Sequence, residues 1–274
     1  MKKIATNPDS ERFRSGADKY AAYLETPEGR LRLDLAFANL QEFLPSATRP
    51  LHALDLGSGT GAVAVRLARL GLHVTLLDES ESMLDFAKRA AREAGVTERI
   101  TLRRGDAAQL ENLFDARSFD VILCHNVLEY VEDPCAVLRS AARVLRDATS
   151  VISILVRTQT GEVLKAAIQQ GDLALAEHNL TTKWGDESLY GGKVSLFTTE
   201  SLQPMLREAS LVIAAERGIR VISDYLPQKV SRNDEYERIF ELERKLGERA
   251  EFVAVARYKH CLAHRAGPIM RDAV

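Results

Sequence analysis

The sequence has few features that would cross-link a chain, anchor it in a membrane or give it a strong charge of one sign. Only three of its 274 residues are cysteine, with no C-x-x-C pair or Cys/His cluster, which indicates a reducing compartment and argues against a metal site. No run approaches the roughly 18 apolar residues of a membrane helix, and the first residues, M-K-K-I-A-T-N-P, contain no apolar signal segment. The 37 Lys and Arg nearly balance the 39 Asp and Glu, which disfavours massive non-specific binding of nucleic acid. We therefore expect a cytoplasmic protein that binds neither membranes nor metal ions.

The chain does contain a regular alternation of short apolar segments and helical segments. The apolar segments predict strands at 51–56, 72–77, 99–103, 119–124 and 150–156. Helices are predicted at 10–23, 31–44, 61–70, 80–94, 134–145, 199–209 and 232–248. Apolar strands that alternate with helices are typical of a parallel sheet covered on both faces. Two further strands, 211–222 and 251–258, would pair antiparallel at one edge. Together these segments predict an α/β fold with a mostly parallel, seven-stranded sheet.

A glycine-rich segment, L-D-L-G-S-G-T-G at 54–61, follows the first predicted strand and opens the next helix. Gly57, Gly59 and Gly61 can adopt positive φ and let a ligand approach the backbone closely. The helix that follows offers free backbone N–H groups at its N-terminus. The same glycines would also suit a tight strand-to-helix turn with no ligand, so the segment alone does not decide between the two.

Acidic residues follow the next two strands. Asp78 ends the second strand, and a ribose-binding acid is expected about 20 residues after such glycines. Its alternative role is to cap the helix that begins near Ser80. Gly105-Asp106 follows the third strand, where a carboxylate can meet an adenine amino group, although a plain turn is the alternative. The pieces together indicate a nucleotide-like ligand at the carboxyl ends of the strands.

The spacing of the glycines distinguishes between cofactors. A dinucleotide site requires G-x-G-x-x-G, whereas this chain has G-x-G-x-G with Asp55 just before it. That combination, over roughly residues 45–157, resembles the S-adenosylmethionine site of class I methyltransferases, which have a Rossmann-like fold. NAD is the disfavoured alternative.

The resemblance implies which residues would surround S-adenosylmethionine. They are Asp55, Gly57, Ser58, Gly59 and Gly61 at the methionine part, Asp78 at the ribose hydroxyls with Glu79 beside it, Asp106, Ala107 and Ala108 at the adenine, and His125 at the sulfonium end. All of these positions fall at the carboxyl ends of predicted strands, where ligands bind in such sheets. His125 is interpreted as part of the pocket wall rather than as a general base.

Further segments narrow the resemblance. They are Y-L-E-T-P-E-G-R-L-R at 23–32, H-N-V-L-E-Y-V-E-D-P at 125–134, G-I-R-V-I-S-D-Y-L at 218–226 and Y-E-R-I-F-E-L-E at 236–243. With these segments, nearly the whole chain resembles bacterial tRNA 5-carboxymethoxyuridine methyltransferases, which methylate the carboxylate of a modified wobble uridine. The resemblance implies a role in tRNA processing with tRNA as partner, and it implies that Arg32 holds the cofactor carboxylate.

One departure from that family keeps another function open. Segment 178–198 contains only Lys183 and Lys193 as basic residues, where members of the family have a run of lysines. An O- or N-methyltransferase that acts on a small-molecule metabolite is therefore the alternative function. A module that binds S-adenosylmethionine without turnover is a third hypothesis, which the intact glycine and acidic positions disfavour.

The chemistry implied by the resemblance requires a cation more than a base. A carboxylic acid with a pKa of about 4 is already an anion at neutral pH, so no general base is needed and no catalytic acid or base is assigned. Arginine suits a carboxylate by its two-pronged geometry. The candidates to orient the substrate are Arg157, Arg220 and Arg14, with Tyr225, and less strongly Tyr23, Trp184 and Tyr190, to stack a base. A surface or core role is the alternative for each.

The resemblance implies a single methyltransferase domain over residues 1–274. Its predicted parts are a helical lid at 1–45, a cofactor-binding core at 46–157, an inserted substrate cap at 158–198, a sheet completion at 199–260 and a tail at 261–274. No pattern in the sequence predicts an oligomeric state.

Overall fold

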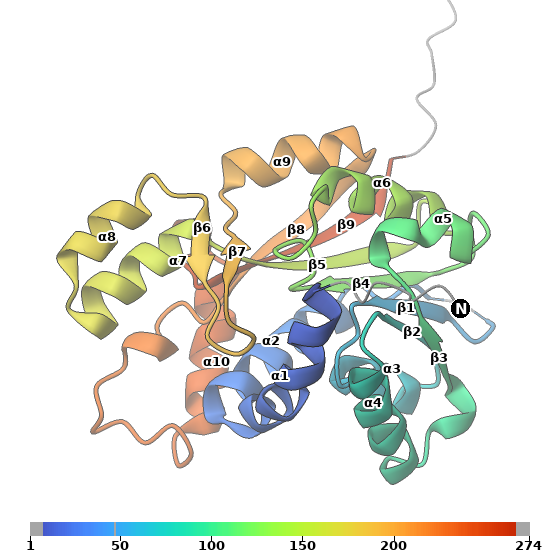
Figure 1. Ribbon diagram of the computed structural model, residues 1–274, viewed down its shortest axis with the longest axis horizontal. Coiled ribbons are helices and arrows are strands. Elements are labelled where there is room, and N and C mark those ends of the chain that lie inside the picture. The colour runs from blue at the N-terminus through green and yellow to red at the C-terminus, as the bar shows by residue number, and fades with distance from the viewer. Residues whose placement is uncertain (1–7, 47, 267–274) are drawn as a thin grey trace, which may run out of the picture.

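The computed structural model describes residues 8–46 and 48–266, with side chains from residue 16 onward, so the side chain of Arg14 lies outside the described part. Its centre is a seven-stranded sheet with the strand order β3-β2-β1-β4-β5-β9-β8 (Figure 1). The strands are β1 (His52–Leu56), β2 (His73–Asp78), β3 (Ile100–Arg104), β4 (Val121–His125), β5 (Val151–Arg157), β8 (Leu211–Ile219) and β9 (Tyr258–Arg265). The first five pair in parallel, and β9 pairs antiparallel with both β5 and β8. The structure confirms the predicted fold class.

Helices cover both faces of the sheet (Figure 1). One face carries α5 (Leu110–Leu113), α6 (Pro134–Val144) and α9 (Thr199–Glu208). The other carries α2 (Pro27–Gln41), α3 (Ala62–Arg69) and α4 (Glu81–Glu93), with α1 (Pro8–Glu25), α10 (Tyr236–Gly247) and α11 (Ala250–Val253) beside them. The buried side chains of β1, β4 and β5 pack against both layers, so the sheet lies between two apolar cores.

Local sequence signals explain where several helices begin and end. Ser80 caps α4 by accepting a hydrogen bond from the Met83 N–H at 3.4 Å, and Gly95 follows the helix with φ of 68°. Asp133 caps α6 in the same way, accepting from the Ala136 N–H at 2.9 Å. Such caps satisfy backbone donors that the helix itself cannot pair, which fixes the boundaries predicted for these two helices.

The segment predicted as an inserted cap lies beyond the end of β5 (Figure 1). It contains α7 (Gln159–Leu164), a π-helical turn η3 (Lys165–Gln170), α8 (Leu173–Asn179), and a hairpin of β6 (Trp184–Asp186) and β7 (Lys193–Ser195). Short 3-10 turns complete the chain: η1 (Thr97–Arg99), η2 (Ala107–Gln109) and η4 (Ser223–Tyr225). None of the described helices is both long and apolar enough to cross a membrane.

The last strand differs from the prediction. The segment 251–258 was expected to be a strand, but its first residues form α11 and the strand is β9, which also takes up the first residues of the predicted tail. The strand is inserted between β5 and β8, so Lys259 and His260 are buried in it. These polar side chains break the apolar pattern from which the strand could have been predicted.

Several predicted boundaries also move, and the helix expected at 232–248 begins at Tyr236. The strand expected at 211–222 ends at Ile219, because Arg220 takes a positive φ of 59° that strands do not contain. The helix expected at 31–44 begins at Pro27, where the Thr26 side chain accepts a hydrogen bond from the Gly29 N–H at 3.1 Å. The earlier start carries Arg32 onto the second turn of α2, facing the carboxyl ends of the strands.

Candidate active site

A large cleft lies at the carboxyl ends of β1, β2, β4 and β5. Its volume is about 750 Å³, which lies in the range of about 300–1,000 Å³ typical of small-molecule sites. The lining residues that the sequence predicted for the cofactor are Arg32, Gly57, Gly59, Asp78, Glu79, Asp106, Ala107, Ala108 and His125. The structure therefore brings together residues from five separate segments of the chain.

Three residues of the predicted set do not line the cleft: Asp55, Ser58 and Gly61. Gly61 has a φ of 73°, and a Cβ there would lie 2.8 Å from the Leu76 side chain. Its role is therefore to let α3 start close to the sheet. Gly59, with a φ of 52°, lies on the cleft side and leaves its backbone open toward the cavity.

The Asp78 carboxylate links the glycine turn to the start of α4. One oxygen accepts a hydrogen bond from the Gly59 N–H at 2.8 Å and the other accepts from the Ser80 N–H at 2.8 Å. Asp78 therefore holds the glycine turn and the start of α4 while it lines the cleft. Burial raises the pKa of Asp78, and these two hydrogen bonds oppose the rise.

Asp55 is a buried carboxylate directly below the turn. Burial, together with the charge of Asp78, raises the pKa of Asp55 to about 8. The shift means that the anion lacks the solvation it would have in water. A cation near Asp55 would restore that stabilisation, so the position suits a ligand that carries an ammonium group.

Arg32 supplies the opposite charge on the other side of the cleft. Its guanidinium is buried and donates hydrogen bonds to Asn126 Oδ1 at 3.0 Å and to the Tyr20 hydroxyl at 3.1 Å. It forms no ion pair with any carboxylate in the described part of the chain. A buried guanidinium that still lacks an anion is suited to bind a ligand carboxylate.

His125 is held as a neutral wall residue at the end of β4. Its Nε2 shares a hydrogen bond of 2.7 Å with Ser153 Oγ, which in turn lies 2.7 Å from His260 Nε2. Burial and the nearby Arg32 lower the pKa of His125 to about 3. An imidazole that stays neutral over the physiological range agrees with a lining role.

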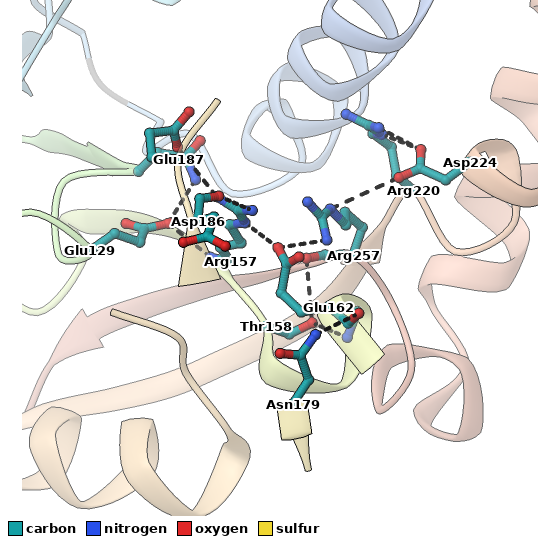
Figure 2. A network of polar contacts seen from close by, with 12 residues as sticks. Glu129, Arg157, Thr158, Glu162, Asn179, Asp186, Glu187, Arg220, Asp224 and Arg257 are labelled. Carbon is teal, nitrogen blue, oxygen red and sulfur yellow. Dashed lines mark hydrogen bonds and ion pairs between the residues drawn. The ribbon is translucent and has the colours of Figure 1, made fainter. Parts of the chain in front are cut away.

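Where β5, the cap and the start of β9 meet, which we call the far end of the cleft, a network of buried charges joins the cap to the sheet (Figure 2). Arg157 pairs with Glu162 and, at 3.2 Å, with Glu187. Arg257 pairs with the same Glu162 at 2.6 Å. The backbone N–H of Arg157 donates to Glu129 at 2.8 Å, which fixes the end of β5 against the loop after β4.

A second branch of the network includes Arg220. Its guanidinium donates to Asp224 at 2.7 Å and to the Tyr23 hydroxyl at 2.8 Å. Arg220 and Arg157 therefore line the cleft as predicted, but each already has a carboxylate partner. Tyr225 does not line the cleft, and its hydroxyl donates to the Gly161 carbonyl at 3.5 Å.

The cleft wall is rich in tyrosine. Five tyrosines line it: Tyr20, Tyr23, Tyr130, Tyr190 and Tyr258. Two of them, Tyr23 and Tyr190, are base-stacking candidates from the sequence, whereas Trp184 is 55% exposed and does not line the cleft. Four arginines around Tyr258 lower its pKa to about 8 against the effect of burial.

The family model described as a methyltransferase domain matches residues 48–210. The chain belongs to this methyltransferase family. The family, the fold and the cleft make it an S-adenosylmethionine-dependent methyltransferase.

Among curated relatives, the methyltransferase is 29% identical over 255 residues to the tRNA 5-carboxymethoxyuridine methyltransferase of Escherichia coli (strain K12). This match covers 91% of this chain and 93% of the relative. The methyltransferase is 36% identical over 116 residues to the ubiquinone biosynthesis O-methyltransferase of Hahella chejuensis (strain KCTC 2396), which covers 42% of this chain and 45% of the relative.

Solved structures share the fold of the methyltransferase. A methyltransferase of Thermotoga maritima, described as a possible histamine N-methyltransferase, superposes with a TM-score of 0.61 at 15% identity and covers 93% of this chain and 98% of its own. The CcbJ methyltransferase of Streptomyces caelestis gives a TM-score of 0.62 at 19% identity, covering 93% of this chain and 98% of its own. At such identities the likeness concerns the fold.

The residues at the cleft of the methyltransferase fit S-adenosylmethionine. That molecule carries a carboxylate, an ammonium, a ribose and an adenine. Arg32 is a buried cation that pairs with no carboxylate among the described residues, and Asp78 is a lining carboxylate. Asp55 lies buried behind the lining, where burial and the charge of Asp78 raise its pKa. At the predicted adenine end, Asp106 accepts the Ala108 N–H at 2.7 Å and so sets the turn that forms the wall.

Sequence reasoning missed several residues of the cleft, among them Tyr258, Arg257, Glu129 and Lys165. Arg257 lies just before β9 and Tyr258 is its first residue, and the strand was predicted too early in the chain, at 251–258. Glu129 stands within the quoted H-N-V-L-E-Y segment, and its position four residues after His125 was the available signal. No sequence signal pointed to Lys165.

Proposed function

We propose that the methyltransferase transfers a methyl group from S-adenosylmethionine to the carboxylate of 5-carboxymethoxyuridine at the wobble position of tRNA, in the cytoplasm. The observation that carries the proposal is the extent of the match to the Escherichia coli relative, 91% of this chain. That extent includes most of the chain outside the 48–210 segment matched by the family model. The O-methyltransferase relative matches only 42% of the chain, which is too little to include both the lid and the segments that close the far end of the cleft.

The geometry of the cleft supports a nucleophile that is already an anion. Bound S-adenosylmethionine supplies an activated methyl group on a sulfonium. A substrate carboxylate oxygen would accept that methyl group as the carbon–sulfur bond breaks, so no residue of the chain would have to remove a proton. The absence of a requirement for a base agrees with His125, whose pKa of about 3 leaves it a weak proton acceptor.

Within the same proposal, the cofactor is held by the predicted set of residues. Arg32 binds the cofactor carboxylate, Asp55 stabilises its ammonium group through space, and Asp78 accepts from the ribose hydroxyls. Asp106, Ala107 and Ala108 line the adenine, with Glu79 near the ribose and His125 near the sulfonium end. The lid residues Tyr20 and Tyr23 exclude water from the transfer, because a solvated sulfonium and carboxylate would lose their close alignment.

A second candidate function is methylation of a small metabolite on oxygen or nitrogen. The observation that favours it is the outer surface of the cap, which presents large apolar side chains where an RNA-binding surface would carry cations. The exposed ones are Ile168, Leu173, Leu180 and Trp184. On this alternative, a general base would be required for a phenol or an amine acceptor.

The experiment is a transfer of labelled methyl from S-adenosylmethionine to bulk tRNA from a strain that lacks this gene, followed by mass analysis of the nucleosides. The proposal predicts a base-labile methyl group on a wobble uridine, since a methyl ester hydrolyses in mild base whereas a methyl ether does not. Binding of S-adenosylmethionine is measured in parallel by calorimetry. Cofactor binding without transfer to tRNA would reject the proposal and direct the search to small carboxylates and phenols.

A further inference from the structure

The cleft contains one cation that the structure leaves without a partner at the substrate end. The cationic side chains that line the cleft are Arg32, Arg157, Lys165, Arg220 and Arg257. The arginines among them other than Arg32 form ion pairs with Glu162, Glu187 and Asp224. Lys165 forms no ion pair and no side-chain hydrogen bond with any residue that the structure describes.

The position of Lys165 in the cap is unusual. It is the first residue of the π-helical turn η3, and Gln169 from the same turn also lines the cleft. Pi-helical turns are rare and occur frequently at functional sites, because the wider turn redirects side chains that an α-helix would place elsewhere. The turn follows directly from α7, whose Glu162 belongs to the buried network (Figure 2). The network therefore fixes the base of the turn that presents Lys165.

The surroundings of the Lys165 ammonium call for an anion. The side chain is half-buried, and burial together with the positive charges of Arg257 and Arg157 lowers its pKa, while Glu162 opposes this in part. The carboxylate of Glu162 is already engaged by both arginines. A second anion brought into the cleft would stabilise the charged lysine without competing with a pair that already exists.

The proposed reaction brings two carboxylates into the cleft, one of the cofactor and one of the acceptor, and Arg32 and Lys165 lie at different parts of the cleft. Arg32 lies among residues of the cofactor end, next to Asn126 and Tyr20. Lys165 lies on the cap side, next to the arginines at the end of β5 and the start of β9. We propose that Lys165 binds the acceptor carboxylate, with the amide of Gln169 as a second donor. This inference rests on the proposed function and identifies its substrate contact.

The assignment has a consequence for turnover. Before transfer, the acceptor is an anion that pairs with the Lys165 ammonium. After transfer, its oxygen is bonded to the methyl carbon, the carbon–sulfur bond is broken, and the acceptor is a neutral ester. The ester cannot form the ion pair, so the enzyme should bind its product less tightly than its substrate.

The test uses the full-length enzyme with an RNA anticodon stem-loop that carries either the free carboxymethoxyuridine acid or its methyl ester. We expect the wild type to bind the acid at least about ten-fold more tightly than the ester, which corresponds to about 1.4 kcal/mol. The Lys165→Met variant should lose this preference, and its kcat/KM on the acid should fall by about 10- to 100-fold. The Lys165→Arg variant should recover part of both, because it restores the positive charge.

Two measurements separate this inference from a structural effect. The affinity for S-adenosylmethionine should be unchanged in Lys165→Met, which reports an intact fold and an intact cofactor site. The matched control is Lys183→Met, which removes an exposed lysine elsewhere in the cap and should leave activity and the acid preference unchanged. A Lys165→Gln variant serves as the second neutral substitution if methionine impairs folding.

Each outcome has a definite meaning. An active wild type whose Lys165→Met variant keeps both the rate and the preference for the acid would overturn the assignment of Lys165 and leave the proposed function standing. A wild type that binds S-adenosylmethionine but does not methylate the acid-bearing RNA would overturn the proposed function, and the assignment of this acceptor to Lys165 with it. Loss of the preference in Lys165→Met alone, with recovery in Lys165→Arg, would support both.

Discussion

Asp55 and Asp78 are two carboxylates at the carboxyl ends of adjacent strands that burial makes difficult to ionise. The pKa of both is raised by burial, and the charge of Asp78 raises that of Asp55 further. Two backbone N–H groups partly compensate Asp78 by hydrogen bonds, whereas nothing lowers the pKa of Asp55. Asp78 is therefore tested by ligand binding, and Asp55 by the stability of the protein.

Replacing Asp78 by alanine should abolish measurable binding of S-adenosylmethionine. The change removes the acceptor proposed for the ribose and also frees the Gly59 and Ser80 N–H groups that it holds. We expect a loss of at least about 100-fold in affinity, or about 2.7 kcal/mol, measured by calorimetry. The matched control is Asp85→Ala, an exposed carboxylate on the same α4 region. An unchanged dissociation constant for Asp78→Ala would remove this residue from the site.

Replacing Asp55 by asparagine should stabilise the ligand-free enzyme at high pH. The folded pKa of about 8 lies above the unfolded value of about 3.9. Stability contributed by the neutral acid is thus complete below pH 4 and is lost as the pH rises through 8. Asparagine stays neutral, so the variant should be more stable by about 1–2 kcal/mol at pH 8, with a gap that closes toward pH 4. Thermal denaturation at both pH values checks this, and a gap of equal size at each would contradict it.

Some site residues could be predicted because their chemistry is local in the sequence. The glycine turn, Asp78 and Asp106 lie at strand ends in the right order, and the turn geometry alone requires residues of these types. Lys165 and Tyr258 could not be predicted as cleft residues, because the fold brings them to the cleft from segments without a sequence motif. A single lysine without a charge partner becomes visible only when the remaining charges are placed in space.

Helix α10 fixes the loop that follows β8. Glu243 of α10 is fully buried and accepts hydrogen bonds from the N–H groups of Val221 at 2.7 Å, Ile222 at 3.0 Å and Ser223 at 2.7 Å. The loop begins at Arg220, whose positive φ interrupts the strand and turns the guanidinium toward Asp224. One carboxylate on a helix thus holds the distinctive 218–226 segment in place.

Replacing Glu243 by alanine should destabilise the protein strongly. Three buried N–H groups would lose a charged acceptor, which we expect to cost about 3–5 kcal/mol in the free energy of unfolding. The melting temperature should fall by roughly 5–10 °C. Glu237→Ala, on the exposed face of the same helix, is the control and should change little. Equal melting temperatures for the two variants would show that the loop is held by other contacts.

The helices and strands themselves were predictable to different degrees. The parallel strands β1 to β5 appear where the apolar segments predicted them. β1, β4 and β5 are buried on both faces, whereas the edge strand β3 is only half-buried. The last strand was predicted at 251–258 but lies at β9. The buried polar residues of β9 are paired across the sheet, Lys259 with Glu216 of β8 at 3.4 Å and His260 with Ser153 of β5. Apolar periodicity cannot reveal a strand whose polar side chains are paired only after the sheet has assembled.

The amino and carboxyl ends of the parallel strands differ in how their carboxylates are stabilised. At the amino end of β4, Asp120 accepts hydrogen bonds from Arg49 at 2.7 Å and Arg146 at 2.8 Å, and from the His52 N–H at 2.9 Å. These partners hold the pKa of Asp120 down to about 2 although burial opposes the shift. Near the carboxyl end of β1, burial instead raises the pKa of Asp55. Asp120 thus stabilises the fold through partners within the chain, whereas burial leaves the Asp55 carboxylate poorly stabilised.

The contribution of Asp120 sets an expected response of the whole protein to acid. Its folded pKa of about 2 is below the unfolded value of about 3.9. The ionised carboxylate thus stabilises the fold above pH 4, and that stability is lost as the pH falls from 4 to 2. Asp120→Asn should be less stable than the wild type by about 1–2 kcal/mol at pH 7, and the difference should vanish near pH 2. Urea denaturation across this range, with the exposed Asp115→Asn as control, measures the effect. A difference that stays constant down to pH 2 would show that Asp120 acts through its shape and hydrogen bonds and that its charge contributes nothing.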